Sequence, residues 1–88
     1  MISNTTPAFW RCYNRLPQNI QLRAQKAYAM WLSDSKHPGL KFKRVSRSEP
    51  VYSVRISLNY RALGVLENNA MLWFWIGSHD DYERLLKG

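Results

Sequence analysis

The stretch VYSVRISLNYRALGVLENNAMLWFWIGSH, residues 51–79, decides the fold of this chain. It contains three apolar runs, separated only by Asn59 and by the Asn68-Asn69 pair. Short runs rich in β-branched and aromatic residues, broken by brief polar turns, are typical of antiparallel strands joined as hairpins. The sequence therefore predicts three consecutive antiparallel strands.

The first of these runs alternates clearly between apolar and polar side chains, and alternation places them on two faces of a strand. One face takes Tyr52, Val54, Ile56 and Leu58, and the other takes Ser53, Arg55 and Ser57. Arg55, like Arg61 in the second run, must reach water, a partner or a ligand, because a buried unpaired charge is costly. We therefore expect a sheet with one apolar face and one wet, positive face.

The last run is apolar on both sides, which predicts that both sides are covered. Strict alternation places Met71, Trp73 and Trp75 on one side, and Leu72, Phe74 and Ile76 on the other. A pair of helices is expected to cover one side. The other side needs the C-terminal segment, a partner or a ligand. We interpret the tryptophans as core residues rather than as a binding platform.

Two helices are predicted before these strands. Thr6-Pro7 has the features of a helix start, since threonine is a good N-cap and proline suits the first helical position. Pro17 ends this helix and starts a second one, which runs to about Asp34. Residues 1–6, MISNTT, are too polar to predict a strand. The apolar stripe of the first helix is formed by Phe9, Cys12, Tyr13 and Leu16.

A further strand and a short helix complete the expected fold. LKFKRV, residues 40–45, predicts a strand with Lys41 and Lys43 on its basic side. Ser78, followed three residues later by Asp81, has capping-box spacing and predicts a final short helix. The chain is thus expected to be an α+β protein: an N-terminal helical hairpin packed on a twisted antiparallel sheet of about four strands, with a short C-terminal helix.

The length of 88 residues predicts a single domain over residues 1–88. No apolar run is long enough to cross a membrane, and the N-terminus lacks the features of a signal peptide. A single cysteine excludes an internal disulfide and suits a cytoplasmic location. Two histidines and one cysteine show no metal-ligand spacing, so we expect neither a metal nor another cofactor.

The basic residues are unevenly distributed. Of the six acidic residues, four follow residue 66, and the net charge is +7. A clustered positive patch on a small domain favours a polyanionic partner such as nucleic acid. A solvated basic face, or a surface for an acidic protein, are the alternatives. Seven basic residues lie between positions 36 and 61: Lys36, Lys41, Lys43, Arg44, Arg47, Arg55 and Arg61.

The order and spacing of several short segments resemble the RelE/ParE superfamily of toxins from bacterial toxin–antitoxin pairs. The segments are LP at 16–17, HPGLKFK at 37–43, YSVRI at 52–56, YRALG at 60–64 and FWIGSHDDY at 74–82. The resemblance covers nearly everything after Thr6. It implies helices packed on a twisted antiparallel sheet. It also implies a cognate antitoxin as partner and, in many members, ribosome-dependent cleavage of mRNA.

The resemblance also implies roles for individual residues. Arg55 and Arg61 resemble the strand arginines of the family, and His79 resembles the C-terminal histidine of its nuclease branch. Tyr82 resembles a nearby C-terminal tyrosine, so Arg61, His79 and Tyr82 are the expected catalytic residues. Lys41 and Lys43, together with Arg55, are expected to bind RNA. Some relatives carry an acidic residue just before the leucine–lysine pair, and Pro38 occupies that neighbourhood in this chain.

These residue types suit metal-free cleavage of RNA by attack of a 2′-hydroxyl on the adjacent phosphorus. Histidine exchanges protons near neutral pH, and arginine offers a fork of donors to phosphate oxygens. The first hypothesis is therefore an mRNA endoribonuclease that acts on the ribosome. The alternatives are a ParE-like inhibitor of DNA gyrase and a non-catalytic module that only binds RNA or an antitoxin.

Overall fold

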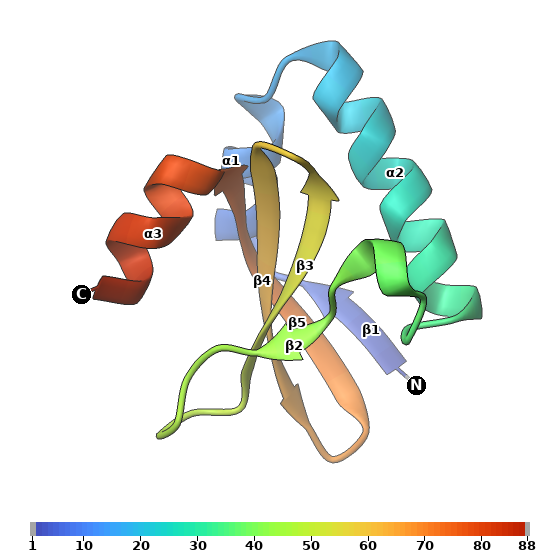
Figure 1. Cartoon of the computed structure of the whole chain (residues 1–88), viewed down its shortest axis with the longest axis vertical. Helices are drawn as coiled ribbons and strands as arrows, with labels where there is room; N and C mark the ends of the chain where they lie inside the picture. Colours follow the sequence, from blue (N-terminus) through green and yellow to red (C-terminus); the bar gives the residue numbers. More distant parts are fainter. Residues whose placement is uncertain (1, 88) are drawn as a thin grey trace.

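The structure is a computed structural model that describes residues 2–87 (Figure 1). Within these residues, three α-helices and one 3-10 helix accompany a sheet of five strands. The elements follow in the order β1 (Ile2–Thr5), α1 (Pro7–Asn14), α2 (Gln18–Ser33), η1 (Pro38–Leu40), β2 (Lys43–Arg44), β3 (Val51–Ser57), β4 (Tyr60–Glu67), β5 (Ala70–Ser78) and α3 (His79–Lys87).

The sheet has the strand order β1-β5-β4-β3-β2. The three strands predicted from residues 51–79 are confirmed as antiparallel neighbours. The prediction that MISNTT forms no strand is wrong, because Ile2–Thr5 pairs in parallel with β5. Main-chain bonds hold it there, from Ile2 N to Asn69 O at 3.2 Å and from Thr6 N to Trp73 O at 3.0 Å. Polar side chains are tolerated because an edge strand stays partly solvated.

The strand predicted for residues 40–45 is much shorter in the structure. Only Lys43–Arg44 pairs with β3, and Pro38–Leu40 forms the 3-10 helix. Pro38 has the backbone φ that suits the start of a helical turn. Lys41 ends that turn in the left-handed region, at φ 47°. The chain therefore becomes extended only after Lys41, although Leu40 is still buried in the core.

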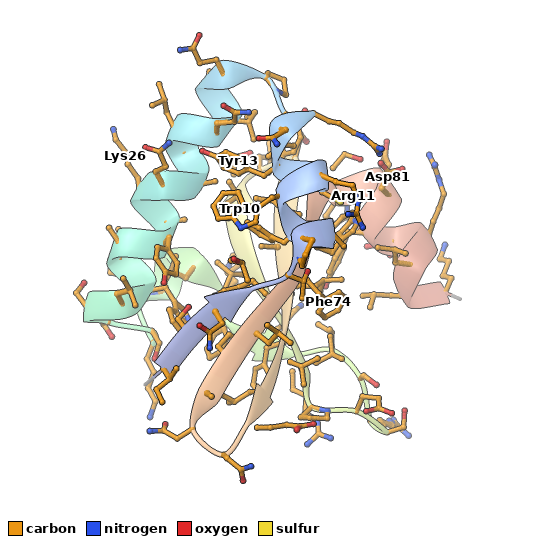
Figure 2. The ribbon with its side chains drawn as sticks, turned by 180° about the vertical axis from the view of Figure 1, so that it is seen from behind. Trp10, Arg11, Tyr13, Lys26, Phe74 and Asp81 are labelled. Atoms are coloured by element: carbon orange, nitrogen blue, oxygen red, sulfur yellow. The ribbon has the colours of Figure 1, made fainter. Side chains whose placement is uncertain are left out.

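The helices lie on both sides of the sheet. The predicted start of α1 is confirmed, with Thr6 Oγ1 accepting a hydrogen bond from Phe9 N at 3.1 Å. α1 packs mainly on β5 and α2 on β3. Hydrogen bonds from Gln21 and Gln25 of α2 to Tyr13 of α1 link the two helices. Figure 2 shows Trp10 and Tyr13 in the space between them. α3 lies across the sheet from α2, against β4 and β5 (Figure 1).

The main core lies between α2 and the sheet. Trp31 is its central aromatic residue, with its ring centroid 5.2 Å from that of Trp73 in an edge-on contact. Burying large aromatic side chains supplies much of the stability of a small domain. The buried cluster comprises Ala24, Ala27, Trp31, Leu40, Val54, Ala62, Met71, Trp73 and Ile76.

A β-bulge changes the faces predicted for the last strand. Leu63 pairs with Trp75, but the next residue, Gly64, pairs with Trp73, so Phe74 is an extra residue in β5. An extra residue reverses the alternation beyond it. Ile76 therefore shares the core face with Trp73, and Trp75 turns to the opposite face with Leu63. The assignment by strict alternation is wrong beyond Phe74, because sequence period alone does not reveal a bulge.

Gly64 lies beside this bulge at a position that has no room for a side chain. A Cβ there would lie 2.7 Å from Met71 Sδ and 2.9 Å from Trp73 Cε3. Gly64→Ala is expected to lower the free energy of unfolding by about 1–3 kcal/mol, because overpacking a tight core forces its neighbours to move. Urea denaturation measures the change.

The matched control for this prediction is Gly39→Ala. Its Cβ would meet only the ring of His37, at 3.2 Å or more, and that exposed side chain can turn away. A stability change at Gly64 no larger than the change at Gly39 would contradict the packing argument.

Candidate functional site

Two arginines face each other on the side of the sheet opposite α2, which α3 covers in part. Arg55 of β3 and Arg61 of β4 are direct cross-strand partners, so their side chains leave the sheet on the same face. Within residues 2–87, neither guanidinium forms an ion pair with a carboxylate. Like charges placed opposite each other are destabilising, and an anion bound between them removes that cost. We call Arg55 and Arg61 the arginine pair.

Arg61 is held firmly by the turn that joins β3 to β4. Its Nη1 donates hydrogen bonds to the carbonyl oxygens of Ser57 at 2.7 Å, Tyr60 at 2.9 Å and Leu58 at 3.3 Å. Its Nε and Nη2 donate to no group within residues 2–87. One end of the guanidinium is thus anchored, while the remaining donors stay free for a ligand. An anchored donor needs little reorganisation when a charge develops beside it.

Charged and polar groups near Arg61 act on the pKa of its guanidinium. Burial lowers the pKa of the Arg61 guanidinium, and the like charge of Arg55 lowers it further. Tyr82 and Glu83 of α3 act in the opposite direction and raise this pKa. An arginine stays protonated under all ordinary conditions, so the side chain keeps its charge. The site therefore combines two cations from the sheet with polar groups from α3.

His79 lies where β5 ends and α3 begins. Its main-chain nitrogen donates to Asn59 O at 2.7 Å, which ties the start of α3 to the same β3–β4 turn that Arg61 caps. The predicted cap of α3 is confirmed, with Ser78 Oγ accepting from Asp81 N at 3.2 Å. The imidazole remains 38% exposed. His79 is thus fixed through its backbone, while its ring is open to a ligand.

Glu83 is a residue of the site that the sequence analysis missed. Its Oε1 lies 3.4 Å from His79 Nε2, one helical turn further along α3. A carboxylate in this position can orient the imidazole and interact with its charged form. The four-residue spacing was visible in the sequence and predicts contact on a helix. What the sequence did not reveal is that this face of α3 points toward Arg61.

Tyr82 anchors α3 to the sheet. It is the buried residue of this helix, with 5% of its surface exposed. Its ring centroid lies 5.6 Å from that of His79, with the planes tilted by 41°. A tyrosine so placed packs through its ring and fixes the position of its neighbours. The structure therefore brings Tyr82 to the site, but with little exposure to a ligand.

The structure separates the two predicted lysines. Lys43 pairs with Ser53 across β2 and β3, so it leaves the sheet on the same face as Arg55. Lys41 lies at the end of η1, outside the strands, and is exposed. The sequence analysis placed both in one strand. Only Lys43 extends the positive face of the sheet through strand register.

Other site types were also considered within residues 2–87. No group of three potential ligands among His, Cys, Asp and Glu is arranged to hold a metal ion there. In this part of the chain, no helix is long and apolar enough to cross a membrane. Cys12 is a free, half-buried thiol on α1. The arginine pair with His79 and Glu83 is therefore the principal cluster of reactive groups.

Comparison with known proteins places this geometry in context. Residues 18–84 match the family model of the ParE-like toxin domain. No curated protein matches the sequence.

Solved structures match the fold along nearly the whole chain. The fold is similar to that in the RelB–RelE antitoxin–toxin complex of Methanococcus jannaschii, with a TM-score of 0.70, 14% identity, and 92% of this chain and 95% of that chain covered. It is also similar to YafQ from Escherichia coli BL21(DE3), with a TM-score of 0.73, 6% identity and coverage of 91% and 94%. The fold is similar as well to that of the YoeB/ParE toxin of Agrobacterium tumefaciens, with a TM-score of 0.70, 13% identity, and 90% of this chain and 99% of that chain covered. The chain therefore has the RelE-like fold.

Proposed function

Because this chain belongs to the family of ParE-like toxin domains, we propose that it is the toxin of a toxin–antitoxin pair and cleaves mRNA on the ribosome. The observation that carries the nuclease part of the proposal is the arginine pair beside His79. Two facing cations that form no ion pair with a carboxylate within residues 2–87 suit the phosphate of a nucleic acid. An exposed imidazole at the same turn supplies a group for proton transfer.

The proposed reaction is a transesterification within the RNA. A base takes the proton of a 2′-hydroxyl, and the oxygen attacks the adjacent phosphorus. The bond from phosphorus to the 5′-oxygen breaks, and an acid protonates that leaving oxygen. The products are a 2′,3′-cyclic phosphate and a free 5′-hydroxyl. Two proton-transfer groups are therefore required, with a cation beside the phosphate.

The residues divide these tasks according to their chemistry. His79 transfers one of the protons, and Glu83 orients it or serves as the second proton-transfer group. Arg61 directs its free donors at the phosphate, where negative charge grows during attack. Arg55 of β3 and Lys43 of β2 bind the backbone on one side of Arg61, and Lys41 at the end of η1 adds positive charge. Tyr82 holds α3 in place.

A cognate antitoxin is the expected protein partner. The structural matches include the complexes whose names pair a RelE-type toxin with its antitoxin. A chain with a net charge of +7 favours an acidic partner. Silencing by such a partner would protect the cell that makes both proteins.

Inhibition of DNA gyrase is the second candidate, because the matching family model is that of ParE-like toxins. Primer extension on mRNA after brief induction of the chain tests the first function, and a gyrase supercoiling assay tests the second. New mRNA ends with normal supercoiling support the nuclease. Intact mRNA with inhibited supercoiling would contradict the nuclease function and support inhibition of gyrase. If neither mRNA cleavage nor inhibited supercoiling were observed, the chain would be a binding module without toxicity.

The salt dependence of binding tests the positive face. Each phosphate contact contributes a slope of about −0.7 to −0.9 to log K against log salt. The triple variant Lys41→Ala, Lys43→Ala and Arg55→Ala is expected to flatten the slope of RNA binding, measured by fluorescence anisotropy. Arg15→Ala, Arg23→Ala and Lys26→Ala is the matched control, because those exposed cations lie at the end of α1 and on α2. An equal change in both variants would contradict the proposed contact surface.

A further inference from the structure

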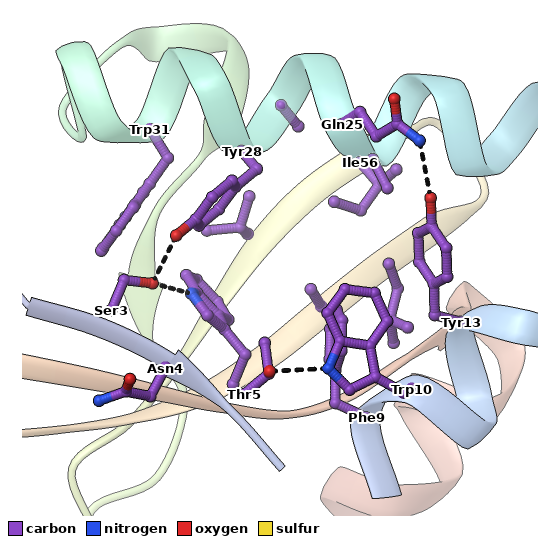
Figure 3. Close-up of a pocket in the computed structure, with 16 residues that line it drawn as sticks. Ser3, Asn4, Thr5, Phe9, Trp10, Tyr13, Gln25, Tyr28, Trp31 and Ile56 are labelled. Carbon is purple, nitrogen blue, oxygen red and sulfur yellow. Dashed lines mark hydrogen bonds between the residues drawn. The ribbon is translucent and has the colours of Figure 1, made fainter. Parts of the chain in front are cut away.

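The sheet has a cavity on each of its two sides. The larger cavity, of about 610 Å³, lies between α1, α2 and β1, and the sheet separates it from the arginine pair (Figure 3). The other, of about 480 Å³, lies between the end of α3 and the loop that joins β2 to β3, on the side away from α2 (Figure 1). We call it the α3 groove, and its lining includes Ser46, Arg47, Leu63, Phe74, Leu85 and Leu86.

Strand register places the α3 groove next to the arginine pair. Leu63 of the groove follows Arg61 by two residues on β4, so both side chains leave the sheet on the same face. Two residues along a strand span roughly 7 Å. That length is close to the separation between a phosphate and its own base in a nucleotide. A phosphate held by the arginine pair therefore brings a nucleobase to the groove.

The apolar lining of the groove suits a flat ring. Phe74 is the extra residue of the β-bulge in β5, and it lines the groove together with Leu63. Bulges beside binding sites re-aim side chains in this way. Leu85 and Leu86 of α3 add apolar surface and remain 51% and 41% exposed. Unpaired nucleobases stack on aromatic side chains of this kind.

The loop beside the groove is held in place by Arg44. Arg44 Nε donates to Ser46 O at 2.8 Å, and its Nη2 donates to Arg47 O at 3.3 Å. Ser46 Oγ accepts from Glu49 N at 3.2 Å, which closes the loop. The side chain of Arg47 is exposed and forms no ion pair within residues 2–87. The loop is thus preorganised, while the Arg47 guanidinium stays available to a ligand.

The charged groups of the groove select among the bases. Within residues 2–87, none of the residues that line it is acidic. Arg47 offers a fork of donors and no acceptor. Guanine presents two adjacent acceptors, O6 and N7, that match this fork, whereas each of the other bases presents at most one acceptor there. A second copy of this chain is a poor occupant, because it would bring a net charge of +7 to a positive face.

We infer that the α3 groove binds a nucleobase of the RNA, with guanine preferred, while the arginine pair holds the phosphate of the same nucleotide. Phe74 stacks on the base, and Arg47 donates to its acceptor edge. For the identity of the polyanion the inference rests on the proposed function. Because phosphate contacts position a nucleic acid and base contacts select its sequence, the groove gives the chain a base preference.

The test uses the full chain and fluorescent 2′-O-methyl tetranucleotides, which cannot be cleaved because the 2′-hydroxyl is blocked. One oligonucleotide carries a single guanine among uracils, the second has an abasic site in its place, and the third has adenine there. All three have the same backbone charge. The guanine oligonucleotide is expected to bind at least about 10-fold more tightly than the abasic one in fluorescence anisotropy, because stacking on the groove is lost without a base. Adenine is expected to give an intermediate affinity.

Two sets of variants locate the contact. Arg47→Ala is expected to weaken binding of the guanine oligonucleotide about 10-fold and to remove its advantage over adenine, whereas Arg23→Ala, an exposed arginine on α2, leaves that advantage unchanged. Phe74→Leu keeps an apolar side chain but loses the ring, and is expected to weaken binding at least about 5-fold, while Phe74→Tyr keeps the ring and the affinity. Thermal unfolding of each variant shows that it is folded.

Equal or undetectable binding of the guanine and abasic oligonucleotides would overturn the inference. An Arg47→Ala variant that weakened both equally would also overturn it, because Arg47 would then contact phosphate alone. NMR shifts of Leu85 and Leu86 that change with protein concentration, without oligonucleotide, would assign the groove to a second copy. No ribosome is present, so these results would leave the proposed nuclease untouched. Conversely, intact mRNA in primer extension together with guanine-dependent binding would reject the nuclease and retain the groove.

Discussion

His79→Ala is expected to lower the single-turnover rate of mRNA cleavage on programmed ribosomes by about 10²–10⁴-fold, the usual contribution of a positioned proton-transfer group. The imidazole is open to solvent, and the backbone of His79 holds the start of α3 against the β3–β4 turn. Alanine keeps that backbone bond, so the variant should fold normally. The lost rate would then report on chemistry and not on stability.

The other histidine of the chain provides a matched control. His37 is exposed in the loop before η1, and His37→Ala is expected to cleave like the unmodified protein. Glu83→Gln separates orientation from charge, because glutamine keeps the shape of the side chain but loses its negative charge. Tyr82→Phe shows whether the hydroxyl acts or the ring only packs. Unchanged cleavage by His79→Ala would refute the catalytic role of His79 and assign the proton transfer to another group.

Arg61→Ala is expected to lower the cleavage rate by about 10²–10³-fold, as is typical when an anchored donor to a developing charge is removed. The affinity for RNA should fall much less, because such a donor acts mainly in the transition state. Single-turnover kinetics over a range of ribosome concentrations give the maximal cleavage rate separately from the ribosome concentration at which half of that rate is reached. Arg61→Lys keeps the charge but loses the fork of donors, and should restore only part of the rate.

Stability needs a separate measurement for this residue, since Nη1 of Arg61 also bonds three carbonyls of the β3–β4 turn. Urea denaturation of Arg61→Ala and Arg61→Lys measures that effect directly. Arg23→Ala, an exposed arginine on α2, is the control for loss of one positive charge. If affinity and rate fell equally, Arg61 would be a binding residue, and the proposed role in the transition state would be wrong.

The sequence alone determined the central strands, the helices and the positive charge that Arg55 and Arg61 bring to the sheet face opposite α2. Alternation across residues 51–57 predicted Val54 in the core and Arg55 on the opposite face, because side chains of a strand alternate with period two. Thr6, Pro17 and Ser78 marked helix boundaries, because capping and proline effects act within a few residues. Local interactions of this kind can be read along the chain.

Only the tertiary structure decided features that depend on pairing between distant residues. Ile2–Thr5 is a strand because the main chain of β5 is available beside it, and not because of its own polar side chains. The bulge at Phe74 arises from register against β4 and moves Ile76 into the core. Glu83 joins His79 and Arg61 only because α3 packs over β4 and β5. These arrangements depend on non-local contacts, which no periodicity in the sequence encodes.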